Sequence, residues 1–338
     1  MFRAPMPWCT VRRGCVPATA TLGMTVRRAI AVFLVALALL RSPGGAAQQA
    51  DVWQALAIEG VEALNRGDDA TALDRFLRAL DTARLFSPDD SRRINSLVNV
   101  AVAYRRLYRF DQAEIYYLEA IQLQELTGDP NIVMSLDALG QVYAARGFAG
   151  RAAELFRDAI ARIERIAGPD HPFTAIVLEH LGDVLMHLGQ YEEVGAIFGR
   201  VVAIREVTFG LTHRSLAPAL TREGIAYMAV SRNLDAAQVL RRALAIWRSG
   251  GPPPPDELIA TLEALVDVSQ SLGRHRDAAD YQRQVVVVRG VQEGERGDRF
   301  ADELVEYVRL LRRAGDAREA DAMAVQAALA RERGVPRP

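Results

Sequence analysis

The sequence predicts an all-α protein of about seven helix–turn–helix repeats, preceded by a cleavable signal peptide. Three observations support this prediction: an internal period of 42 residues, small residues at fixed places in each period, and an apolar run that follows two arginines near the N-terminus. No segment alternates apolar and polar residues over a useful length, so no sheet is expected. Half of the 338 residues are hydrophobic and 25% are charged, which is typical of a globular protein.

The leader has the three parts of a secretory signal. Residues 24–28 end in the basic pair Arg27-Arg28, residues 29–40 are continuously apolar, and residues 42–47 are mostly small. Twelve helical residues reach about 18 Å, well short of the ~30 Å hydrocarbon core, so a retained span is not expected. We expect cleavage between Ala47 and Gln48 and a periplasmic or secreted protein, because no Cys follows that could take lipid. The alternative is a cytoplasmic or membrane-associated protein with an uncleaved leader.

Residues 1–23 are predicted to be an extension upstream of the true start, because Met24 opens a complete signal. Both cysteines, Cys9 and Cys15, lie in this extension, so the remaining chain has no disulfide, thiol nucleophile or Cys-based metal site. All 41 basic residues are Arg, which indicates GC-rich coding and a bacterial source. No basic tail is present that would favour nucleic-acid binding.

An internal repeat occupies the rest of the chain. Leu139-Gly140, Leu181-Gly182 and Glu223-Gly224 are spaced by 42 residues, and Leu stands four residues before the Gly place in every copy. Small residues at two later places let helices approach closely, and bulky residues fill the space between copies. The solenoid is expected over 51–338, with copies near 51–91, 92–130, 131–172, 173–214, 215–256, 257–298 and 299–338.

Each copy is predicted to form a helix A, a short turn and a helix B. Turns such as 146–148, 188–190 and 314–316 contain a Gly that can end a helix in the left-handed conformation. Pro and Gly between copies, as in residues 168–172 and the four-Pro run at 252–255, end helix B.

Leu-Gly in helix A, Ala in helix B and Gly in the turn resemble the tetratricopeptide repeat (TPR) over residues 51–338. The 42-residue period and Gly168-Pro169-Asp170-His171-Pro172 resemble its kinesin-light-chain variety, whose Leu-x-Asn-Leu-Ala stretch is kept at residues 97–101. The resemblance implies a right-handed superhelical solenoid whose A helices line a concave groove for protein or peptide segments. It also implies a non-enzymatic scaffold or adaptor.

The groove is expected to use helix-A residues outside the Leu, Gly and Ala framework. These are Asn95, Asn99, Arg106, Asp137, Gln141, Glu179, Asp183, His187, Arg222, Glu263 and Asp267. An acidic middle flanked by Arg favours a partner with basic or amide-rich segments. The alternative is an ordinary solvated helix face.

Sequence patterns for catalysis are missing. Without Lys no Walker-type phosphate loop can form, and there is no Gly-x-Ser-x-Gly elbow or His-Glu-x-x-His motif. His180, Asp183 and His187 share one helix face and leave open a zinc-dependent enzyme, but no fourth group or general base is placed. We expect no catalytic residue, metal or cofactor. An exported scaffold within a cell-envelope complex is favoured over a cytoplasmic adaptor.

The last predicted helix is followed by few residues. Residues 331–338 are too short for a capping helix, so Met323, Val325 and Leu329 are expected to leave an apolar edge. We therefore expect self-association, or docking of a partner, at the C-terminal repeat.

Overall fold

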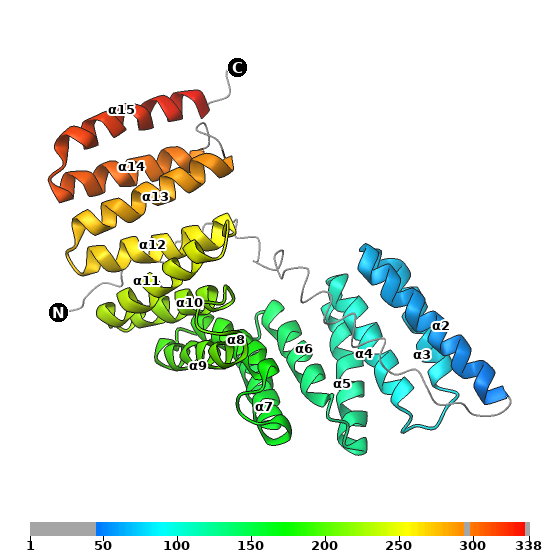
Figure 1. Ribbon diagram of the computed structural model, residues 1–338. Helices are drawn as coiled ribbons and strands as arrows, with labels where there is room; N and C mark the ends of the chain where they lie inside the picture. Colours follow the sequence, from blue (N-terminus) through cyan, green and yellow to red (C-terminus); the bar gives the residue numbers. More distant parts are fainter. Residues whose placement is uncertain (1–44, 294–297, 335–338) are drawn as a thin grey trace, which may run out of the picture. The chain divides into compact units, whose positions relative to one another are not determined.

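The computed structural model describes residues 45–293 and 298–334, which form 14 α-helices and no strand (Figure 1). The helices are α2 (Gly45–Arg66), α3 (Asp69–Ala83), α4 (Ser91–Arg106), α5 (Phe110–Thr127), α6 (Ile132–Ala145), α7 (Ala149–Ala167), α8 (Pro172–His187), α9 (Tyr191–Phe209), α10 (Leu216–Ala229), α11 (Asn233–Ser249), α12 (Pro255–Ser271), α13 (His275–Glu293), α14 (Asp298–Ala314) and α15 (Ala317–Gly334). The all-α prediction is confirmed. The predicted extension and nearly all of the predicted signal peptide lie outside the described residues.

The helices form seven A–B pairs, each of which falls within one predicted copy to within two residues, except at the N-terminus. There α2 begins at Gly45, before the predicted start of the first copy. Ala46, Ala47 and the glutamines that follow favour helix, so they extend α2 toward the N-terminus. The predicted cleavage position therefore lies in the first turn of α2.

Helices A and B approach each other as closely as the small residues predict. A Cβ on Gly140 would lie 2.5 Å from Cε1 of Phe156, and one on Gly182 would lie 2.6 Å from Cε2 of Phe198. Both phenylalanines are buried. In the turn, Gly147 has a φ of 82°, which is the left-handed conformation expected after a helix. Gly140 and Gly182 are thus required because any side chain would clash with a buried phenylalanine. Gly147 is required because its backbone is in the left-handed conformation.

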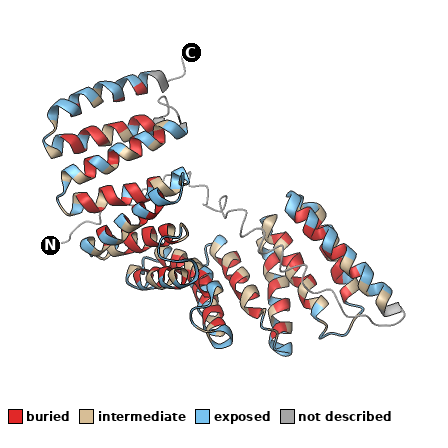
Figure 2. Ribbon diagram, viewed as in Figure 1, coloured by how far each residue is buried: buried red, intermediate tan, exposed pale blue. Residues whose placement is uncertain are grey.

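The chain divides into two compact units, Met1–Asp129 and Pro130–Pro338. The first contains α2–α5 and the second contains α6–α15. In both, buried residues face neighbouring helices and exposed residues cover the outer faces (Figure 2). Within the second unit, A helices of successive copies touch directly, α6 with α8 and α10 with α12. Helix-A side chains of successive copies can therefore contact one another.

The C-terminal helix α15 leaves part of its apolar surface exposed. Val325 is 62% exposed and Leu329 is 43% exposed, whereas Met323 packs partly against the core of the last copies. Self-association through this edge stays a prediction. Within residues 45–293 and 298–334, no helix combines the length and apolar composition needed to cross a membrane.

Candidate functional site

The predicted groove residues of the first unit are largely engaged by their own chain. Nε of Arg106 donates to Oδ1 of Asp69 at 2.6 Å, which links the end of α4 to the start of α3. Asn99 is buried, and its Oδ1 accepts no hydrogen bond from any described residue. Asn95 is half-buried. Arg106, the one charged residue among these three, is therefore already paired with Asp69.

Asp137 and His180 form a pair between α6 and α8. Nδ1 of His180 lies 2.7 Å from Oδ1 of Asp137, and Nε2 of Gln141 donates to Oδ2 at 2.8 Å. Burial disfavours the protonated imidazole, but the charge of Asp137 and its hydrogen bond outweigh that effect and raise the pKa of His180. Asp137 is consequently neutralised within the chain.

A second pair joins α8 to α10. Nε of Arg222 lies 2.8 Å from Oδ1 of Asp183. Glu179 forms an ion pair with Arg205 of α9. His187, at the end of α8, is exposed. The carboxylates of the predicted acidic middle therefore carry partners inside the molecule and offer little uncompensated charge.

The geometry does not support the zinc hypothesis. His180 is paired with Asp137, and Asp183 is paired with Arg222, so both side chains are engaged by residues of other helices. In the part of the chain that the structure describes, no three His, Cys, Asp or Glu side chains are grouped so that they could hold a metal ion.

Acidic side chains predominate on the A helices of the last two copies. We call Glu263 and Asp267 of α12, with Glu303 and Glu306 of α14, the acidic face. Desolvation and the charge of Glu303 raise the pKa of Glu263 to about 7. Desolvation and the charge of Glu306 raise the pKa of Asp267 to about 6. Arg289 of α13 lies 3.6 Å from Glu263 and 3.7 Å from Glu303, so one guanidinium is shared by two carboxylates.

Glu303 and Glu306 were not among the predicted site residues. Glu306 stands two 42-residue periods after Arg222, and Asp267 stands two periods after Asp183. An acidic pair thus replaces the Asp183–Arg222 ion pair at the same repeat places. Reading α14 at the offsets applied to the preceding copies would have found it.

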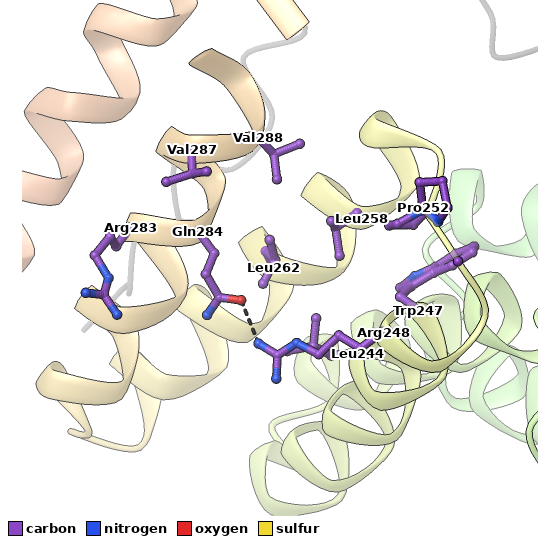
Figure 3. A pocket seen from close by; sticks show the side chains of 12 residues that line it. Leu244, Trp247, Arg248, Pro252, Leu258, Leu262, Arg283, Gln284, Val287 and Val288 are labelled. Atoms are coloured by element: carbon purple, nitrogen blue, oxygen red, sulfur yellow. Dashed lines mark hydrogen bonds between the residues drawn. The ribbon is translucent and has the colours of Figure 1, made fainter. Parts of the chain in front are cut away.

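A cleft of about 580 Å³ lies between α11, α12 and α13, and it was not predicted (Figure 3). Its lining is mainly apolar and includes Trp247, Leu258, Leu262 and Val287. Arg248 donates to Oε1 of Gln284 at 2.7 Å, which joins α11 to α13. Glu206 occupies the place of Arg248 one period earlier and pairs with Arg242. The cleft depends on the path of the loop before α12, which the periodic pattern does not specify.

A family model of the tetratricopeptide repeat matches residues 131–206 and 174–249, and a second model with the same description matches residues 93–129. The chain is a tetratricopeptide-repeat protein. The matched ranges include both partners of the Asp137–His180 and Asp183–Arg222 pairs. No curated protein matches the chain significantly.

Solved structures agree with this TPR fold. Nearly identical TPR-like repeats described as a kinesin light chain, from Podosopora anserina, superpose with a TM-score of 0.52 and 20% identity, over 60% of this chain and 97% of that one. BtubC (BKLC) from P. vanneervenii gives 0.57 and 19%, over 66% and 91%. The apo form of RapI gives 0.54 and 12%, over 83% and 98%. The predicted kinesin-light-chain-like type of TPR fold is confirmed.

Repeats of this fold stack into extended surfaces that bind other proteins. TPR proteins are generally non-enzymatic scaffolds. The surfaces described above are therefore candidates for protein contact.

Proposed function

We propose that this TPR protein is a non-enzymatic scaffold that binds a basic protein segment on the acidic face of α12 and α14. The grouping of four carboxylates on α12 and α14 carries the proposal: Glu263 and Glu303 share Arg289, and Glu306 pairs with Arg309 of its own helix. Desolvation and like charge raise the pKa values of Glu263 and Asp267, in agreement with this crowding. A cationic segment relieves both effects and so binds favourably.

The A-helix surface of α6, α8 and α10 plays a different part in this proposal. Its acidic groups are already paired, so it contributes shape and hydrogen bonds, from side chains such as Gln141 and His187, in place of net charge. Asn95 and Arg106 of the first unit form a separate contact in the proposal, whereas Asn99 is buried and takes no part in it.

Binding of charged peptides to the full chain tests the acidic face. A fluorescent peptide of alternating Arg and Gly is expected to bind, and its counterpart with Asp in place of Arg is not. The double variant Glu263→Gln/Asp267→Asn is expected to weaken binding about tenfold, since charged hydrogen bonds across an interface contribute that much.

The control is a double variant that removes two exposed carboxylates elsewhere, Glu154→Gln/Asp170→Asn. It should change affinity by less than about twofold. Equal losses in both double variants would show attraction to net charge alone, and no loss in the first would remove the acidic face from the function.

We also propose that the protein acts outside the cytoplasm, in the periplasm or after secretion, within a cell-envelope complex. The basic, apolar and small-residue order of the leader supports this. Cell fractionation with intact mass on the native protein tests it: an exported species should begin near Gln48. A cytoplasmic species that retains Met1 or Met24 would overturn export and favour the adaptor alternative.

A further inference from the structure

Glu223 is buried at a place where the repeat framework has leucine. Leu139, Leu181 and Leu265 occupy this place in three other copies of the second unit, and all three are buried. Glu223 is only 8% exposed. A buried carboxylate in place of leucine costs folding free energy unless a partner compensates it.

The first copy also has Glu at this place, but there it has a cation. Oε2 of Glu59 lies 2.8 Å from Nε of Arg75. In the copy of Glu223, the place of Arg75 is taken by Val239. The hydroxyl of Tyr227 donates to Oε1 of Glu223 at 3.1 Å, and over residues 45–293 and 298–334 no ion pair reaches this carboxylate. Burial raises the pKa of Glu223, although the bond from Tyr227 opposes the shift.

A second departure from the repeat makes room beside this carboxylate. Gly199 of α9 stands where neighbouring copies have Arg157 and Arg241. Arg157 pairs with Glu193 of the next B helix at 2.9 Å, and Gly199 cannot form such a pair. A Cβ on Gly199 would lie 3.3 Å from Oε1 of Glu223. Gly199 therefore lies beside the carboxylate of Glu223, and a larger residue at this place would crowd it and fill the adjacent space.

Gly199 and Glu223 line a cleft of about 350 Å³ between α9 and α11, with α10 at its floor. Its apolar walls are Val202, Ala203, Leu220 and Val239. Arg242 lines the cleft but is held by Glu206 and by the carbonyl oxygen of Leu211. The cleft thus combines apolar walls with a carboxylate that forms no ion pair with any described residue, although the more distant charges of Arg242 and Arg232 oppose the rise of its pKa.

We propose that this cleft binds an alkylammonium group, with the carboxylate of Glu223 accepting its N–H donors and the apolar walls holding its methylene chain. The ligand supplies the cation that Arg75 supplies to Glu59 in the first copy. Oε1 of Glu223 already accepts the Tyr227 hydroxyl, so a free guanidinium that binds both oxygens would compete with this bond, whereas a compact ammonium on a flexible chain can approach the other oxygen alone. Such a group comes from a lysine side chain of a protein partner or from a free diamine. None of these residues belongs to the acidic face, so the two proposals stand separately.

Calorimetric titration of the full chain tests the site with three probes: 1,5-diaminopentane, Nα-acetyl-lysine N-methylamide and the norleucine amide that lacks the ammonium. The first two are expected to saturate one site and the third is not. Tighter binding of the lysine amide assigns the site to a partner's lysine, and tighter binding of the diamine assigns it to a free amine.

Glu223→Gln keeps the shape of the side chain and should weaken binding about tenfold or more, because a charged hydrogen bond is lost. Glu164→Gln makes the same chemical change outside the cleft and serves as the control. Glu164 stands one period before Glu206, which lines the cleft, but Glu164 itself does not line it. Failure of both amines to bind the natural chain, or equal binding to Glu223→Gln, would overturn the proposal.

Val239→Arg provides a second test that does not remove the carboxylate. It reproduces the Glu59–Arg75 arrangement, so the new guanidinium should occupy the cleft, abolish amine binding and raise Tm. Undiminished amine binding in a folded Val239→Arg variant would show that the ligand does not contact Glu223.

Discussion

Two stretches of A-helix surface in the second unit use the same repeat places in opposite ways. Between α8 and α10, Asp183 meets Arg222 at 2.8 Å. Two periods later Asp267 of α12 faces the charge of Glu306 of α14, which together with desolvation raises the pKa of Asp267. The position in the repeat determines where a side chain lies. The residue type determines whether neighbouring charges on the surface pair with each other or remain available to a charged partner.

The largest effect on the self-paired stretch is expected from Asp137→Ala. The variant leaves the largely buried imidazole of His180 without its counter-ion and should lose about 2 kcal/mol of unfolding free energy at about pH 6. The pKa of His180 is raised in the folded state, so the pair stabilises fully below the unfolded value of about 6.5 and its contribution is lost as pH rises through the folded pKa. Urea unfolding at about pH 6 and about pH 9 measures the difference.

Asp183→Ala is the control for that experiment, because the Asp183–Arg222 pair is more exposed and contains no histidine. It should cost less than about 1 kcal/mol. A deficit of Asp137→Ala that is the same at both pH values would contradict the assigned role of His180.

Arg222→Glu tests the comparison by converting the self-paired stretch into an acidic one. Asp183 would then face a carboxylate, and the loss of unfolding free energy should be about 1 kcal/mol at neutral pH, because an attraction becomes a repulsion. The loss should shrink at about pH 4, where carboxyl groups begin to take up protons. Arg222→Gln removes the cation without adding an anion and should cost less; a larger cost for Gln would mean that the arginine acts by packing.

Glu306→Arg is the reverse change. It replaces a repulsion of Asp267 by an attraction but also breaks the ion pair between Glu306 and Arg309, so the last copies should gain no more than about 0.5 kcal/mol near pH 8. The folded pKa of Asp267 is raised to about 6, so the natural protein loses stability as pH rises from the unfolded value near 4 through the folded value. The variant should show a smaller loss over this range. Amide hydrogen exchange in α12 and α14 reports it locally, and faster exchange than in Glu306→Gln at alkaline pH would contradict the expected pairing with Asp267.

The helix pairs, turns and close helix contacts could be predicted from the sequence because they recur with the 42-residue period. The partner of each polar side chain could be predicted only where both residue types recur, as in Glu164–Arg200 and Glu206–Arg242, which are one period apart. Elsewhere the residue type changes at one of the two places, and the pairing changes with it. Asp137 was assigned to the groove, yet it meets His180 at a separation of 43 residues. Glu223 was visible as a break in the Leu-Gly series, but its cleft depends on Gly199 in a preceding helix, which only the packing brings beside it.

The smallest effect on stability is expected from His187→Ala, and this makes the variant useful. His187 is exposed at the end of α8, so unfolding free energy should change by less than about 0.5 kcal/mol. A change in peptide affinity would then report contact with the partner and not a change in the fold. If the Arg–Gly peptide occupies only the acidic face, its affinity should be unaltered in His187→Ala and reduced in Glu263→Gln/Asp267→Asn. A matching reduction in both variants would show that the segment extends from α12 and α14 along the A helices to α8, which makes the self-paired stretch part of the binding surface despite its internal pairing.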